Sequence, residues 1–87
     1  MAEAYAWYED QKVGLGEEFL RCIEANVNTI RRFPEMHEVK FKKFRRGLVR
    51  RFPYGVFYEY NSGENRVIIY GIFHNAENPK KWRERLS

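Results

Sequence analysis

RRGLVRRFPYGVFYEY, residues 45–60, joins a basic first half to an aromatic second half. Pro53 separates the halves, and because proline cannot donate to a sheet ladder it predicts a strand junction, bulge or edge. Alternate residues of the second half share one face of a strand, namely Tyr54, Val56, Tyr58 and Tyr60. The stretch therefore predicts an aromatic strand. The arginines before it either form a functional surface or are ordinary solvated charges on the face of the sheet.

A second strand is predicted at Arg66–Phe73, after the loop NSGEN at 61–65. The Asn and Gly of that loop supply the positive-φ positions that a short hairpin needs. In RVIIYGIF, Val67, Ile69 and Phe73 alternate with Ile68, Tyr70 and Ile72, so both faces are apolar. This pattern predicts the central strand of the sheet, covered on both sides. A further strand is expected at Val39–Lys43, where alternating lysines suit a sheet edge.

Two helices are predicted before the strands, at Ala2–Lys12 and Leu15–Phe33. The second carries the clearest helical period in the chain, with apolar residues every three or four positions at Leu15, Phe19, Ile23, Val27 and Ile30. Gly14 is expected to adopt a left-handed cap conformation, and Pro34 to end the second helix. In the first helix Tyr8 belongs to the apolar stripe and Glu9 is expected to face solvent.

A short basic helix is predicted at the end of the chain, with Asn78 as its cap and Pro79 as its first residue. The expected fold class is α+β: an N-terminal helical hairpin packed on a small antiparallel β-sheet of three main strands, with a short C-terminal helix. Residues 1–87 are expected to form a single domain.

The composition favours an acidic or polyanionic partner. Sixteen Lys and Arg against twelve Asp and Glu give a net charge of +4. Cys22 is the only cysteine, so no internal disulfide can form, and it is expected to be a small buried residue. No apolar run is long enough for a membrane helix, and nothing has metal-ligand spacing. We therefore expect a cytoplasmic protein without membrane contact, metal or cofactor.

Four segments in this order resemble the toxin subunits of bacterial type II toxin–antitoxin modules, the RelE/ParE superfamily. They are AYAWYEDQKVGLGEEFL at 4–20, RRFPYGVFYEY at 50–60, VIIYGIFH at 67–74 and NPKKWRERL at 78–86. The resemblance implies a growth-inhibiting toxin of a plasmid-stabilisation module that a cognate antitoxin neutralises. It also implies a homodimer or a toxin–antitoxin hetero-oligomer.

Two features depart from the superfamily pattern. The chain begins inside the first helix, whereas members usually begin with a strand, so the sheet is expected to have an unpaired edge. Gly55 stands where the ribonuclease members tend to carry arginine, and Glu77 stands in a loop that is often basic. The resemblance is therefore closer to the ParE-like branch, which acts on DNA gyrase by protein contact. The alternatives are a RelE-like endoribonuclease that cleaves mRNA on the ribosome, or an inactive member.

The candidate site residues follow from both branches, and whether the chain is an enzyme is left open. His74, Tyr54 and Arg50 are the candidate catalytic residues, with Tyr70 as another proton carrier. The alternative for His74 is a strand-end histidine hydrogen-bonded to backbone. Candidate contacts to a partner or to phosphate are Arg45, Arg46, Arg51, Lys80, Trp82 and Arg83. A third hypothesis, a plain nucleic-acid-binding module, has aromatic side chains stacking on bases.

Overall fold

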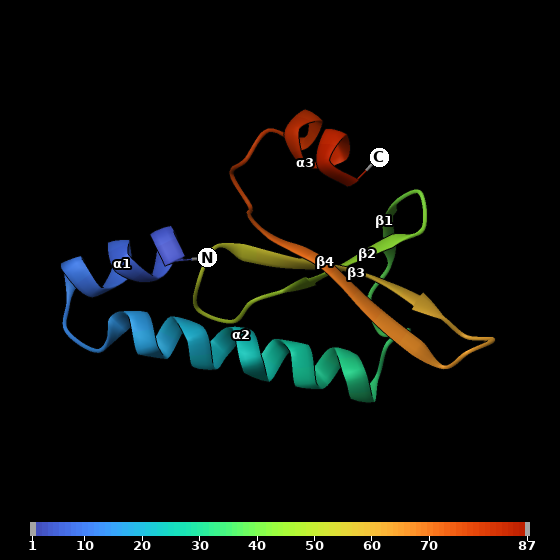
Figure 1. Ribbon diagram of the computed structural model, residues 1–87, viewed down its shortest axis with the longest axis horizontal. Coiled ribbons are helices and arrows are strands. Elements are labelled where there is room, and N and C mark those ends of the chain that lie inside the picture. Colours follow the sequence, from blue (N-terminus) through green and yellow to red (C-terminus); the bar gives the residue numbers. More distant parts are fainter. Residues whose placement is uncertain (1, 87) are drawn as a thin grey trace.

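The computed structural model describes residues 2–86 and confirms the α+β class (Figure 1). The elements, in chain order, are α1 (Ala2–Gln11), α2 (Leu15–Arg32), β1 (Val39–Phe41), β2 (Phe44–Leu48), β3 (Tyr54–Asn61), β4 (Arg66–His74) and α3 (Pro79–Leu86). The sheet has four strands instead of three, because the basic half of residues 45–60 forms a strand of its own before Pro53. No helix within residues 2–86 is long and apolar enough to cross a bilayer.

The strands lie in the order β1-β2-β3-β4, and every neighbouring pair is antiparallel. The prediction that Arg66–Phe73 is the central strand is wrong, because β4 lies at the edge of the sheet. The two inner strands are β2 and β3, and in β3 Val56, Phe57 and Tyr58 are all buried. The outer side of β4 has no partner strand in the described part of the chain.

A bulge in β4 explains why its apolar pattern was misleading. Phe57 lies opposite Gly71 and Tyr58 lies opposite Ile69, so Tyr70 is an extra residue on β4. The extra residue reverses the alternation. Ile72 therefore packs against the same cluster as Val67, whereas Phe73 belongs to the cluster on the other side of the sheet. The predicted grouping of Phe73 with Val67 is wrong for this reason.

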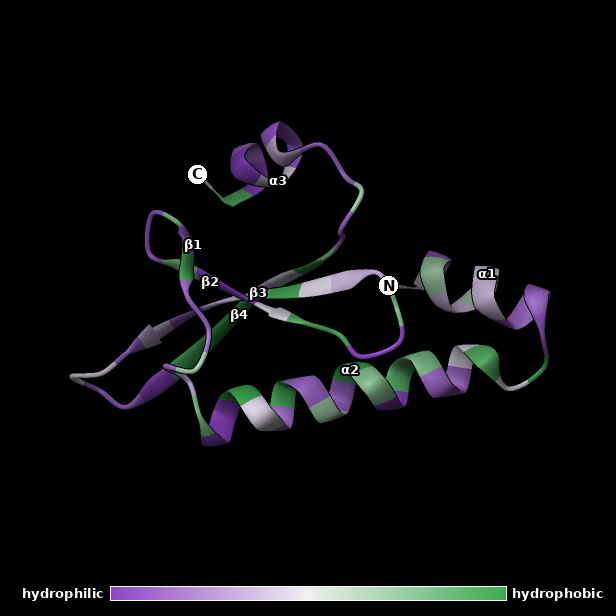
Figure 2. Ribbon diagram, turned by 180° about the vertical axis from the view of Figure 1, so that it is seen from behind, coloured by the Kyte–Doolittle hydropathy of each residue, from purple (hydrophilic) through white to green (hydrophobic). Residues whose placement is uncertain are grey.

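Each face of the sheet carries its own hydrophobic cluster. On the side of α1 and α2, the first cluster contains Phe19, Ile23, Ile30, Val49, Phe52, Val56 and Tyr58. On the side of α3, the second cluster contains Phe44, Phe57, Phe73, Trp82 and Leu86. Figure 1 shows α2 along one side of the sheet and α3 on the opposite side. Most of α3 is hydrophilic in Figure 2, so its few apolar residues anchor it to the sheet.

The junction between α1 and α2 depends on Glu9, which was expected to face solvent. Gly14 has the left-handed conformation that was predicted, with a φ of 90°. It is the N-cap residue of α2, but no side chain at this position caps the helix. The Glu9 carboxylate instead accepts hydrogen bonds from the backbone N–H groups of Gly14 at 3.2 Å and Gly16 at 2.8 Å. A carboxylate at a helix N-terminus satisfies free N–H groups and complements the helix dipole. Glu9 therefore fastens α1 to the start of α2.

Candidate partner-binding site

The connection between β2 and β3 presents two of the candidate arginines at the surface. Val49 and Phe52 are buried in the first cluster, so the two residues between them, Arg50 and Arg51, are directed outward. The loop is closed by the Val49 N–H, which donates to the Tyr54 carbonyl at 2.8 Å. Arg51 has a φ of 71°, an uncommon conformation for a residue with a side chain. The two apolar anchors therefore fix where this basic turn lies.

A groove of about 590 Å³ separates this connection from α2. One wall is a helical stripe of α2, with Glu18, Arg21, Cys22, Ala25, Asn26 and Thr29, and the other wall is Leu48, Arg50 and Arg51. Arg51 forms an ion pair with Glu18 across the groove. Three arginines against one glutamate make the groove basic, as the composition predicted for a contact with an acidic partner.

The groove keeps its shape through a second link between its walls. The Asn26 side-chain N–H donates to the Leu48 carbonyl at 3.0 Å. Gly47 permits this close approach, because a Cβ atom there would lie 2.8 Å from Asn26 Oδ1 and 3.0 Å from Ile30 Cδ1. The half-buried Cys22 thiol lies in the wall and packs against the first cluster. The groove is therefore built by packing and does not depend on the arginines.

The candidate catalytic pair Tyr54 and His74 lies elsewhere. These residues are opposite each other on β3 and β4, and their rings are 5.0 Å apart between centroids. They line a separate pocket of about 360 Å³ with Trp7 of α1, Glu77 of the loop before α3 and Arg85 of α3. Neither Arg50 nor Arg51 lines this pocket, and neither Tyr54 nor His74 lines the groove. The structure therefore brings Tyr54 and His74 together but separates both from Arg50, the third residue that the sequence grouped as catalytic.

The chemistry of the Tyr54–His74 pair is unfavourable for proton abstraction. His74 Nδ1 accepts a hydrogen bond from the Ala76 backbone N–H at 2.9 Å, so the neutral ring carries its proton on Nε2. This geometry matches the alternative of a strand-end histidine bonded to backbone. Burial raises the pKa of the Tyr54 hydroxyl. In the same pocket, Glu77 forms an ion pair with Arg85 at 3.3 Å, so the Arg85 guanidinium already has a carboxylate partner.

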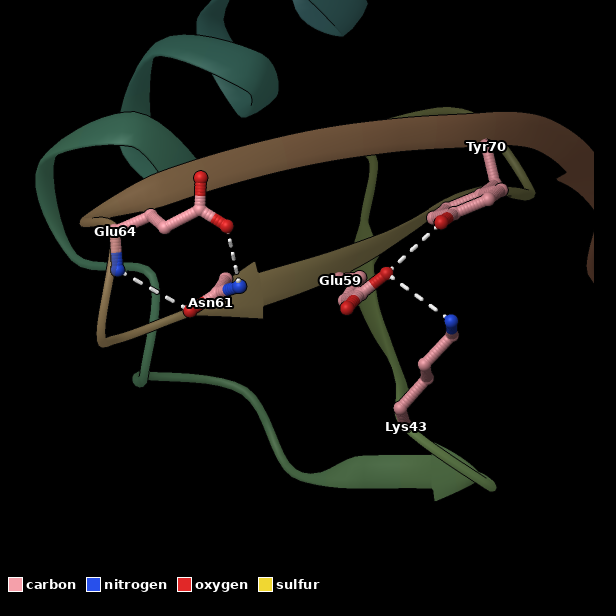
Figure 3. Close-up of polar contacts among 5 residues, drawn as sticks. All are labelled: Lys43, Glu59, Asn61, Glu64 and Tyr70. Carbon is pink, nitrogen blue, oxygen red and sulfur yellow. Dashed lines mark hydrogen bonds and ion pairs between the residues drawn. The ribbon is translucent and has the colours of Figure 1, made fainter.

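Tyr70, the other proposed proton carrier, is bound within a small polar network (Figure 3). Its hydroxyl donates to Glu59 at 2.8 Å, and Lys43 lies 3.5 Å from the same carboxylate oxygen. The hydrogen bond to Glu59 is the main cause of the raised pKa of Tyr70. Asn61 and Glu64 form a neighbouring pair of hydrogen bonds across the hairpin loop. The network braces the exposed hairpin and holds the Tyr70 proton.

Most of the remaining candidates make contacts within the chain. Arg45 donates to the His37 carbonyl at 2.6 Å and to the Glu35 carbonyl at 3.3 Å. Trp82 is buried, with its ring 4.9 Å from that of Phe57 between centroids. Arg83 lies over the Trp82 ring at 5.3 Å, and Lys80 is exposed on α3. Arg45 and Trp82 therefore have structural roles. Among residues 2–86, no group of three or more His, Cys, Asp or Glu is placed to hold a metal ion.

The comparison with known families agrees with the fold. A sequence model described as "ParE toxin of type II toxin-antitoxin system, parDE" matches residues 1–79, which is most of the chain. The chain belongs to the ParE toxin family. No curated protein matches the chain. Family membership makes it a toxin of the type II toxin–antitoxin class.

In this member of the ParE family, the space next to the Cα atom of Gly55 is filled by a neighbouring side chain. A Cβ atom at position 55 would lie 2.7 Å from Arg46 Cδ, so the Arg46 side chain crosses β3 at that point. Its guanidinium lies 5.9 Å from the centre of the Phe57 ring, and its Nε atom is buried without a hydrogen-bond partner in the described structure. The aliphatic part of the Arg46 side chain, which comes from the neighbouring strand β2, therefore fills the space beside Gly55.

Arg21 was not identified from the sequence, although it lines the groove on the wall opposite Arg50. Its position was available from the helical period, because it belongs to the stripe of α2 that adjoins the buried residues Phe19 and Ile23. The helical period does not give the angle at which α2 crosses the sheet. It therefore could not show that this stripe faces the basic turn at 50–51.

Proposed function

We propose that the chain arrests growth by binding a protein target, DNA gyrase, and that an acidic antitoxin neutralises it in the cytoplasm. The family match over residues 1–79 carries the proposal. Within the family resemblance, gyrase-directed toxins act by protein contact and need no catalytic constellation. The separation of Arg50 from Tyr54 and His74 supports that branch over the ribonuclease branch.

Cleavage of RNA by attack of a ribose 2′-hydroxyl needs a base and cations that converge on one phosphate. His74 presents Nε2–H at its free edge, so it can donate a proton there but not accept one without changing tautomer. Glu77 adds a carboxylate to the same pocket. Both observations support a contact-based toxin rather than a ribonuclease.

Induced expression of the chain in a bacterial host tests this function. We expect growth to stop while messenger RNA stays intact and plasmid supercoiling is disturbed. The His74→Ala variant is expected to arrest growth as fast as the parent, because a contact mechanism needs no proton transfer by His74. Growth curves, message integrity on northern blots and plasmid topology on chloroquine gels provide the three measurements.

Cleaved messages with normal supercoiling would contradict the proposal and favour the ribonuclease. A slower arrest by His74→Ala, with cleavage lost in parallel, would place His74 in that reaction. A soluble, folded product that leaves growth unchanged would mean that the chain is an inactive member of the family.

A further inference from the structure

The groove between α2 and residues 48–51 has cations that the chain itself leaves unused. Arg21 and Arg50 are exposed, and neither makes a hydrogen bond or ion pair with another of the residues that the structure describes. A guanidinium presents planar donors that match a carboxylate in a two-point contact. Two such groups on opposite walls of one groove suit a chain segment that carries carboxylates on both sides.

We infer that this groove binds an acidic peptide segment of the antitoxin, with carboxylates at Arg21, Arg50 and Arg51 and an apolar side chain on the groove floor. The inference rests on the proposed function for the identity of the partner. It adds the site, the residues and the character of the bound segment.

The ion pair between Arg51 and Glu18 is a built-in competitor for this ligand. Its arginine side chain is 66% exposed and its glutamate side chain 34% exposed, so solvent reaches both partners. Ion pairs of this kind contribute little to stability. A carboxylate of the bound segment can therefore replace Glu18 on Arg51 at small cost, and Glu18 then weakens binding by its own negative charge.

The apolar surface and the length of the groove favour a peptide. Cys22 and Ala25 of the α2 wall and Leu48 of the opposite wall supply this surface, which we call the groove floor, and Leu48 is 56% exposed although it is large and apolar. From Glu18 to Thr29 the helical wall rises about 16 Å, at 1.5 Å per residue. That length accommodates about five residues of extended peptide at 3.3 Å each.

A nucleic acid fits the same groove poorly. Single-stranded nucleic acid is bound by basic grooves that also offer aromatic rings for base stacking. Among residues 2–86, no aromatic side chain lines this groove, and Glu18 would repel a phosphate backbone. The mixture of cations, one carboxylate and an aliphatic floor is instead what an acidic peptide with an apolar side chain requires.

Fluorescence anisotropy with a labelled peptide, Glu-Glu-Ala-Leu-Ala-Glu-Glu, tests the inference on the full chain. We expect Arg21→Ala and Arg50→Ala each to weaken binding by about five- to tenfold, since each removes a charge-assisted contact. Glu18→Gln is expected to tighten binding by about threefold, because Arg51 loses its competing partner. The altered side chains are on the surface, so the variants keep the parent fold by circular dichroism.

Two controls separate the groove from general charge attraction. Arg66→Ala removes the same charge from the start of β4, where Arg66 pairs with Glu64 at 3.8 Å, and is expected to change the affinity less than twofold. The matched peptide with Gln for every Glu is expected not to bind. Equal weakening by Arg66→Ala, unchanged binding in Arg21→Ala and Arg50→Ala, or tighter binding of an oligouridylate than of the acidic peptide would overturn the inference.

The outcome is independent of the growth experiment, because the binding assay contains neither cells nor gyrase. Peptide binding without growth arrest would overturn the proposed function and keep the groove as an acidic-peptide site. Growth arrest without peptide binding would keep the toxin and overturn the groove.

Discussion

Replacing Trp82 with alanine is expected to destabilise the protein by about 3–5 kcal/mol, the usual cost of truncating a buried Trp or Phe side chain. Trp82 is 8% exposed and its ring contacts those of Phe57 and Phe41. Trp82 and Leu86 are the two residues of α3 in the second cluster. Because a domain of this size is stabilised by only about 5–15 kcal/mol, the variant should unfold at a much lower urea concentration.

Trp7→Ala is the matched control for this experiment. Trp7 is 58% exposed and lies on α1, so its removal is expected to cost less than about 1 kcal/mol. Urea titrations followed by circular dichroism compare the two variants with the parent. Equal stability of the two variants would show that Trp82 is a surface contact, as the sequence-based hypothesis of a partner-binding Trp82 requires.

Phe19→Ala is expected to cost a similar amount, about 3–5 kcal/mol, on the other face of the sheet. Phe19 is fully buried, and its ring lies 5.0–5.1 Å from the rings of Tyr8, Phe52 and Tyr54 between centroids. It therefore joins α1, α2 and the basic turn. Thermal unfolding measures the effect, and a fall of well over 10 °C is expected for an 87-residue domain at about 4–8 °C per kcal/mol.

Phe33→Ala makes the same chemical change at the other end of α2. Phe33 is 54% exposed, so this variant should lose less than about 1 kcal/mol. Phe19 also holds Phe52, which positions Arg50 and Arg51, so Phe19→Ala is expected to weaken peptide binding in the groove as well. A Phe19→Ala variant as stable as Phe33→Ala would contradict the packing of the first cluster.

The regular helices could be predicted because their signals are local. The three- and four-residue spacing in α2 correctly identified Phe19, Ile23 and Ile30 as buried. Asn78 caps α3 as predicted, since its side-chain oxygen accepts the Lys80 N–H at 2.9 Å. Gly14 adopts the expected positive φ.

The order of the strands could not be predicted from pattern alone. A strand with apolar residues on both faces is typical of an inner position, but β4 lies at the edge, where Ile69 and Tyr70 are exposed, and a bulge at Tyr70 reverses its faces. The capping role of Glu9 was missed for a related reason. It depends on the angle between α1 and α2, which residue spacing does not fix.

The charged residues of the candidate site could be predicted from the sequence, but the contacts between them could not. The basic turn at Arg50 and Arg51 was identified from sequence, whereas its ion pair with Glu18 joins residues 33 positions apart. Arg45 and Arg46 looked equivalent to Arg50 and Arg51 in the sequence. In β2, however, Arg45 donates to a backbone carbonyl and Arg46 lies over the Phe57 ring. Only packing distinguishes the two pairs.

Supercoiling of relaxed plasmid by purified DNA gyrase, with and without the purified chain, tests the central claim most directly. We expect the chain to inhibit supercoiling in a concentration-dependent way, and His74→Ala to inhibit equally well. Unchanged supercoiling at a large molar excess of folded chain, together with cleavage of ribosome-bound messenger RNA by the same preparation, would contradict it.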